Sequence, residues 1–208
     1  MHAFRLMLEV MGTVAFAASG AVVAIRKKMD IFGVVILALT TAVGGGMIRD
    51  VLLDVTPPAT FRNPVYALTA TAVALIVFLR PVRHYLTGTH KAYQLTMLVM
   101  DSLGLGIFTA VGVSAAYAAQ PEAGVFLSVF TGVLSGVGGG VLRDVMAGDT
   151  PYIFVKHIYA CASLAGALAC ALLWRVLDPA YAMLIGAALV VVIRILSAIY
   201  KWNLPRAD

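Results

Sequence analysis

Long apolar segments separated by short polar connections dominate the chain. A helix that spans a bilayer needs about 20 mostly apolar residues, and the pattern supplies seven segments of roughly that length. We therefore expect an all-α polytopic membrane protein that forms a single transmembrane domain over residues 1–208. The seven predicted spans cover residues 5–25, 32–53, 64–80, 94–118, 124–146, 153–174 and 179–200.

Two long motifs occur twice. The run Gly44-Gly45-Gly46-Met47-Ile48-Arg49-Asp50 recurs 94 residues later as Gly138-Gly139-Gly140-Val141-Leu142-Arg143-Asp144. The pattern Glu9-x-x-Gly12-x-x-x-Phe16-x-x-x-Gly20 recurs as Asp101-x-x-Gly104-x-x-x-Phe108-x-x-x-Gly112. A three-helix unit repeated in tandem enters the membrane from opposite sides, so the sequence predicts an inverted repeat. Its halves are about residues 5–80 and 94–174, and the segment 179–200 is an additional C-terminal helix.

Composition and charge agree with a membrane protein. Hydrophobic residues make up 62% of the chain and charged residues 12%, about half the charged fraction of a soluble domain. Most of the basic residues lie in the connections, where they determine topology, and no basic stripe with interleaved aromatics points to nucleic acid. The side predicted to be cytoplasmic carries Arg26, Lys27, Lys28, Arg80, Arg83, Lys91, Lys156, Lys201 and Arg206, and the other side chiefly Arg5, Arg62 and Arg175. This distribution predicts an external N-terminus and a cytoplasmic C-terminus.

The glycine triplets allow two interpretations. They let a neighbouring helix approach closely, or they let their own helix unwind so that backbone carbonyls face a pathway. Matching triplets in both halves, each followed by Arg-Asp, favour the pathway. Close packing alone is the alternative.

The Arg-Asp pairs raise the question of partners. Neighbouring residues on a helix project about 100° apart, so Arg49 and Asp50 are not expected to face each other. The repeat suggests reciprocal pairs, Arg49 with Asp144 and Arg143 with Asp50. Alternatively, the charges are structural braces at the membrane boundary.

Four further polar residues are candidates within apolar segments. Asp101 lies well inside its segment, where acids normally mark ion paths or proton relays. Its counterpart Glu9 is more simply explained as a headgroup-region residue beside Arg5. The hydroxyls of Thr41 and Ser135 precede the triplets, and each can offer oxygen to a cation or bond a carbonyl one turn back.

Enzymatic motifs are lacking. The sequence contains no His-Glu-x-x-His, no Gly-x-Ser-x-Gly and no Gly-x-x-x-x-Gly-Lys phosphate loop. We expect a protein that is not an enzyme, with no cofactor and no tightly bound metal. Tyrosines near segment ends, such as Tyr66 and Tyr159, are expected to be anchors at the membrane interface.

The doubled Gly-Gly-Gly-x-x-Arg-Asp motif and the three-plus-three helices with a seventh resemble the prokaryotic trimeric intracellular cation (TRIC) channels. The same family is also described as a glycine-transporter-like membrane domain family. The resemblance implies a homotrimer in a bacterial inner membrane, surrounded by membrane lipids. It also implies a pore within each subunit that conducts monovalent cations, chiefly K⁺ but also Na⁺, and that the two glycine-interrupted helices help to form.

We therefore expect passive K⁺ conduction, with Asp50, Asp101 and Asp144 favouring cations. The alternative is a secondary transporter for glycine or another small solute, in which the arginines and acids would bind the substrate's charges. A third hypothesis is a membrane scaffold that transports nothing. The candidate pathway and gating residues are Thr41, Gly44, Gly45, Gly46, Arg49, Asp50, Asp101, Ser135, Gly138, Gly139, Gly140, Arg143 and Asp144, with Glu9 as a weaker candidate.

Overall fold

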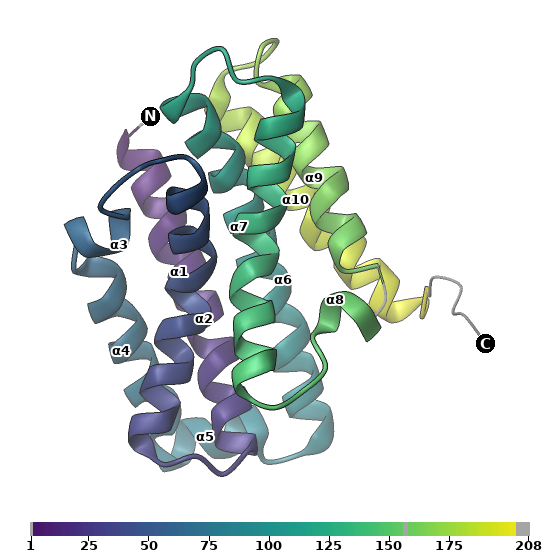
Figure 1. Ribbon diagram of the computed structural model, residues 1–208. Coiled ribbons are helices and arrows are strands. Elements are labelled where there is room, and N and C mark those ends of the chain that lie inside the picture. The colour runs from purple at the N-terminus through teal and green to yellow at the C-terminus, as the bar shows by residue number, and fades with distance from the viewer. Residues whose placement is uncertain (1, 156–157, 203–208) are drawn as a thin grey trace.

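Ten helices follow one another in the computed structural model (Figure 1), which describes residues 2–155 and 158–202. No strand forms within these ranges, and Lys156 and Arg206 lie outside them. The helices are α1 (His2–Arg26), α2 (Ile31–Leu52), α3 (Ala59–Arg62), α4 (Val65–Phe78), α5 (Arg80–Thr87), α6 (His90–Ala119), α7 (Val125–Met146), α8 (Tyr152–Val155), α9 (Ala160–Leu173) and α10 (Pro179–Ile199).

Five of these helices, namely α1, α2, α6, α7 and α10, are long and apolar enough to cross a membrane. The count rises to six if the bent pair α4–α5 is one span, and α9 is apolar but shorter, with 14 residues. The all-α polytopic class is thereby confirmed. The third and sixth predicted segments yield shorter helices than expected. The third ends early because Pro81 has no N–H to continue the hydrogen bonds of α4, and α5 turns away by 83°.

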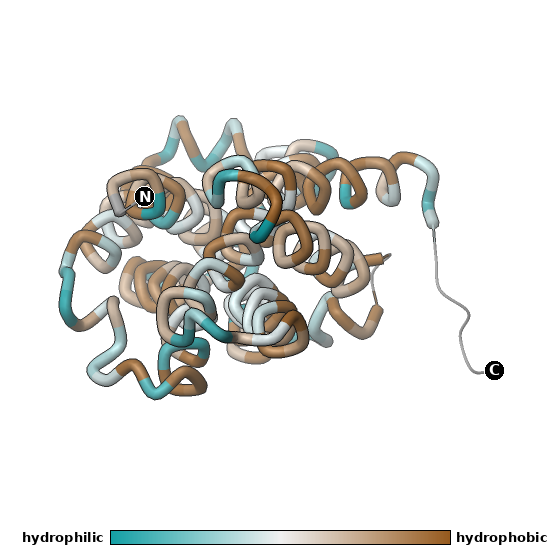
Figure 2. Tube along the Cα trace, turned by 90° about the horizontal axis from the view of Figure 1, so that it is seen from above, coloured by the Kyte–Doolittle hydropathy of each residue, from teal (hydrophilic) through white to brown (hydrophobic). Residues whose placement is uncertain are grey.

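The long helices run in both directions through the bundle (Figure 1). The first helix, α1, runs from the top of the view to the bottom, whereas α6 runs from the bottom to the top. Seen from above, hydrophilic positions gather at helix ends and connections (Figure 2). The inner helices α1, α2, α6 and α7 pack on one another, and α4, α9 and α10 cover them from outside.

Glycines on α1 and α6 make room for phenyl rings from the opposite helix. A Cβ atom at Gly104 would lie 2.0 Å from the ring of Phe16, and one at Gly12 would lie 3.0 Å from the ring of Phe108. The two rings stack with centroids 5.4 Å apart. The motif repeated in the sequence thus produces the same contact twice, once from each helix.

The glycine triplets lie where α2 crosses α7. A Cβ atom at Gly45 would lie 2.3 Å from the backbone oxygen of Ser135, and one at Gly139 would lie 2.2 Å from that of Thr41. Both helices continue through their triplets without a break. The expectation of glycine-broken helices is therefore wrong, because both triplets are close-packing positions between intact helices. The missing side chains allow two backbones to touch, and each helix stays intact.

Candidate functional site

Each Arg-Asp pair is a local ion pair. The Nη2 atom of Arg49 lies 2.7 Å from Oδ1 of Asp50, and Nη2 of Arg143 lies 2.8 Å from Oδ1 of Asp144. Both arginines also donate through Nε to the same oxygen at 2.8 Å. The predicted reciprocal pairing is wrong, because the long arginine side chain curls round the helix and spans the angle between neighbouring positions.

The second oxygen of each aspartate holds the following segment. Oδ2 of Asp50 accepts a hydrogen bond from the backbone N–H of Ala59 at 2.8 Å, and Oδ2 of Asp144 accepts one from Tyr152 at 2.9 Å. Ala59 and Tyr152 begin the short helices α3 and α8. Both aspartates therefore fasten the end of a long helix to the next helix, as the brace interpretation requires.

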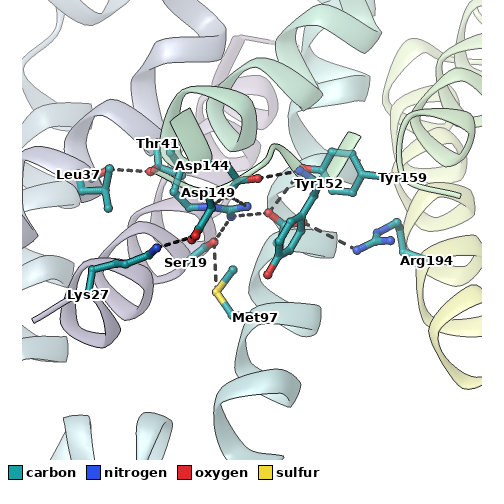
Figure 3. A network of polar contacts seen from close by, with 12 residues as sticks. Ser19, Lys27, Leu37, Thr41, Met97, Asp144, Asp149, Tyr152, Tyr159 and Arg194 are labelled. Atoms are coloured by element: carbon teal, nitrogen blue, oxygen red, sulfur yellow. Dashed lines mark hydrogen bonds and ion pairs between the residues drawn. The ribbon is translucent and has the colours of Figure 1, made fainter. Parts of the chain in front are cut away.

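Arg143 is the centre of a buried ionic cluster, which we call the Asp101 cluster (Ser19, Asp101, Arg143, Asp144, Tyr159 and Arg194). Arg143 has no exposed surface. Its Nη1 atom lies 2.6 Å from Oδ1 of Asp101 and donates to Oγ of Ser19 at 2.5 Å. Side chains from α1, α6, α7, α10 and the segment before α9 converge there (Figure 3).

Arg194 of α10 also faces this cluster. Its Nη2 atom is 4.0 Å from Oδ2 of Asp101, and its guanidinium lies over the ring of Tyr159 at 4.8 Å. Among the described residues, neither Oδ2 of Asp101 nor Nε of Arg194 has a hydrogen-bond partner. Sequence reasoning missed Arg194. The sequence did contain a signal, because Arg194 is the one charged residue of the last apolar segment. Charged residues within membrane segments usually have a functional role.

The equivalent acid of the first half lines a pocket. Glu9 accepts a hydrogen bond from Nε of Arg5 at 3.1 Å and another from the hydroxyl of Tyr66. Arg5 is the expected neighbour, and Glu9 is only 8% exposed, so its carboxylate is enclosed by the protein. We call this space the Glu9 pocket. It is lined by Glu9, Thr13, Ala42, Val43, Gly46, Arg49, Ala59, Thr60, Tyr66 and Phe108.

The two polar sites use equivalent residues differently. In the Asp101 cluster the arginine of the Arg-Asp pair contacts the acid directly. In the Glu9 pocket Glu9 instead bonds Arg5 and Tyr66, while Arg49 bonds Asp50. One site is therefore filled by its own ion pair and the other leaves open space. Tyr66 and Tyr159 both reach the acid, and Tyr159, at 3% exposed, is not an interface anchor.

The two candidate hydroxyls also differ. Oγ1 of Thr41 donates to the carbonyl of Leu37 at 2.6 Å, which is the ordinary bond one turn back. Oγ of Ser135 is buried and has no hydrogen-bond partner within the described part of the chain. Ser135 is thus the hydroxyl with an oxygen still available at the α2–α7 crossing.

Of the remaining triplet glycines, Gly44 and Gly138 lie at the same crossing, whereas Gly140 faces Tyr159 and Gly46 faces Arg49 of its own helix. A Cβ atom at Gly44 would meet Leu142 at 2.4 Å, and one at Gly138 would meet the Cα atom of Gly45 at 3.1 Å. One at Gly140 would meet the hydroxyl of Tyr159 at 2.7 Å. Across residues 2–155 and 158–202, no group of three His, Cys, Asp or Glu side chains is arranged to hold a metal ion.

These ion pairs predict which charges are energetically coupled. In a double-mutant cycle on the free energy of unfolding, Arg49→Gln and Asp50→Asn are expected to couple by about 1–3 kcal/mol, because they contact each other. Arg49→Gln and Asp144→Asn are expected to be additive within about 0.5 kcal/mol. The cycles can be measured by reversible unfolding in mixed detergent micelles. Strong coupling between Arg49 and Asp144 would restore the reciprocal pairing.

A bundle of apolar helices with two polar sites between its inner helices defines a polytopic α-helical membrane protein. The glycine transporter family model matches residues 6–81 and 98–175, so the chain belongs to that family. It is 40% identical over 201 residues to a UPF0126 membrane protein of Deinococcus radiodurans, covering 95% of this chain and 89% of the relative. It is 39% identical over 163 residues to the UPF0126 inner membrane protein YadS of Escherichia coli K12, covering 77% and 74%.

Solved structures connect this family with the TRIC channels. The fold matches a TRIC cation channel with a TM-score of 0.83 at 34% identity, covering 97% of this chain and 96% of the other. It also matches the TRIC trimeric intracellular cation channel orthologue of Rhodobacter sphaeroides with a TM-score of 0.87 at 33% identity, covering 95% and 98%. The resemblance to prokaryotic TRIC channels drawn from the doubled motif is thereby confirmed.

Proposed function

We propose that this protein is a channel for monovalent cations, chiefly K⁺, with a pore inside each subunit of a homotrimer in a bacterial inner membrane. The likeness to TRIC cation channels over nearly the whole chain supports this function. Conduction of ions down their gradient requires no catalytic group and no cofactor. The observation that carries the proposal is the pair of polar sites between the inner helices of the bundle.

The ion path that we propose joins these two sites. It enters through the Glu9 pocket, which is partly lined by Phe108. It passes the stacked rings of Phe108 and Phe16 and reaches the Asp101 cluster. In this conformation the ion pair between Arg143 and Asp101 blocks the far end. It fills the space in the second half that is equivalent to the open Glu9 pocket of the first half. Release of that pair would open the path.

We also propose the full seven-span topology with its inverted repeat, residues about 5–80 and 94–174, and an added helix at about 179–200. Support comes from the contacts that occur twice, such as Phe16 on Gly104 and Phe108 on Gly12. The basic residues at the end formed by the α1–α2 connection and α5 support a cytoplasmic location for that end. The N-terminus is then outside and the C-terminus inside.

Transport of glycine is a second candidate, favoured by one specific observation. Glu9 and Arg49 line the same pocket, and together they offer a carboxylate for an ammonium group and a guanidinium for a carboxylate. A transporter would bind glycine there and alternate its access, whereas a channel needs a continuous wet path with weak sites.

The function is tested by flux into liposomes that contain the purified protein, with K⁺ and glycine gradients applied separately at a clamped potential. We expect K⁺ flux without glycine flux. We also expect Glu9→Gln to lower K⁺ flux about five-fold, since one charge near the path contributes roughly 1 kcal/mol of attraction in a wet site. Glu122→Gln is the matched control, because Glu122 is exposed on the connection between α6 and α7.

Two results would contradict the channel. Saturable glycine uptake without independent K⁺ conductance would make Glu9 and Arg49 a substrate site. Absence of both fluxes from a correctly folded protein would favour a membrane scaffold.

A further inference from the structure

A cationic hollow lies at the end of the bundle that carries most of the basic connections. Helix α5 crosses this end, at the bottom of Figure 1, after the 83° bend that separates it from α4. The hollow, which we call the α5 hollow, lies between α5 and the end of α1. It is lined by Ile25, Arg80, Arg83, His84, Thr87 and Gly88.

The sequence of α5 turns its polar face into this hollow. Its polar side chains occupy positions one, four, five and eight of the helix, a spacing that places them on one face, and all four line the hollow. On the other face Leu86 packs against the core, and Tyr85 is 81% exposed. Because α5 directs all its cationic side chains into the hollow, the hollow attracts anions.

Within the described part of the chain, no acidic side chain lines the hollow or compensates its charge. The acids described near this end are engaged elsewhere, because Asp30 caps α2 through the N–H of Gly33 at 2.7 Å and Asp149 pairs with Lys27 at 2.5 Å. The neighbouring end of α1 adds another cation, Arg26.

The position of the hollow relative to the bilayer indicates the source of the anion. The apolar helix α4 ends at Phe78, and α5 then turns nearly perpendicular to it, so α5 lies along the membrane surface at headgroup depth. Just before the bend, Ile76 and Leu79 are 54% and 56% exposed, which provides an apolar surface for acyl chains. Cations at this depth attract anionic lipids.

We propose that the α5 hollow binds the phosphate group of an anionic phospholipid. Arg80 and Arg83 supply the charge and the donors to the phosphate oxygens, whereas the hydroxyl of Thr87 donates to the carbonyl of Arg83 at 2.7 Å. The acyl chains lie along the exposed apolar side of α4. The site is separate from the Glu9 pocket and the Asp101 cluster, and it does not depend on what the protein conducts.

The test measures phosphatidylglycerol binding to the purified full-length protein in neutral detergent, by native mass spectrometry across a lipid titration. We expect Arg80→Gln/Arg83→Gln to weaken binding about 30-fold. Each of the two arginines contributes about equally to the affinity for an anionic lipid at the membrane surface, and the variant loses both contributions. The matched control is Arg175→Gln/Lys201→Gln, which removes the same charge from exposed positions on other elements. The control is expected to bind like the unmodified protein.

A competition arm identifies the source of the phosphate. Inorganic phosphate at the same concentration is expected to leave the bound phosphatidylglycerol in place, because it lacks the acyl chains. Equal binding by the Arg80→Gln/Arg83→Gln variant and the unmodified protein would overturn the site. Displacement of the bound phosphatidylglycerol by inorganic phosphate would contradict a lipid ligand and would assign the hollow to a soluble phosphate.

Discussion

Arg143→Gln is expected to lower the free energy of unfolding by about 3–5 kcal/mol, the usual cost of removing one partner of a buried ion pair. Arg143 is completely buried and contacts two carboxylates, those of Asp101 and Asp144. Glutamine cannot neutralise either of them. Arg194 stays 4.0 Å from the other oxygen of Asp101 and compensates only in part. Unfolding of the purified protein in mixed micelles measures the change.

The repeat supplies a matched control for this variant. Arg49 occupies the equivalent position and is almost as deeply buried, but its described ion pair is with Asp50 alone. Arg49→Gln should therefore cost clearly less than Arg143→Gln. Equal losses would mean that the contact between Arg143 and Asp101 adds nothing to stability. A double variant that adds Asp101→Asn should recover part of the loss, because it removes one of the stranded charges.

Gly45→Ala and Gly139→Ala are expected to be the next most damaging substitutions. Each new Cβ atom would lie 2.2 to 2.3 Å from a backbone oxygen of the opposite helix, and a backbone cannot move aside as a side chain can. Overpacking of this kind costs about 1–3 kcal/mol, occasionally more. The higher helix propensity of alanine offsets up to about 1 kcal/mol of that cost.

Gly46→Ala is the control within the same triplet. Its nearest contact would be Nη2 of Arg49 at 3.7 Å, an ordinary van der Waals distance, so the propensity gain should leave the protein equally or more stable. Thermal unfolding in detergent distinguishes the variants. If all three substitutions behaved alike, the crossing of α2 and α7 would not depend on backbone contact.

The charged residues show how far sequence reasoning reaches. The doubled motif singled out Arg143, Asp144 and Asp101, and all three side chains are buried. It failed on their partners, because the projection angle of neighbouring positions ignores the reach of an arginine side chain. It also missed Arg194, which lies in a segment without a counterpart in the repeat and so had no second copy to draw attention to it.

The glycine triplets illustrate the same limit. A triplet in an apolar segment is compatible with an unwound helix and with a close helix crossing, since both need residues without side chains. The unbroken course of both helices and the position of Ser135 and Thr41 on the opposing backbones distinguish the two. That position depends on how two helices far apart in the chain approach each other.

By itself, the sequence determined the all-α membrane class, most helix bounds, the family resemblance and the set of residues to examine. Apolar segment length and motif repetition can be read directly from the sequence, because they do not depend on how the helices pack. The tertiary structure decided that the Glu9 pocket is open while the Asp101 cluster is filled, although both halves carry the same residue types. The difference arises because Arg143 reaches the acid of its own half, whereas Glu9 is held by Arg5 and Tyr66, and such a choice of partner depends on side-chain positions in three dimensions.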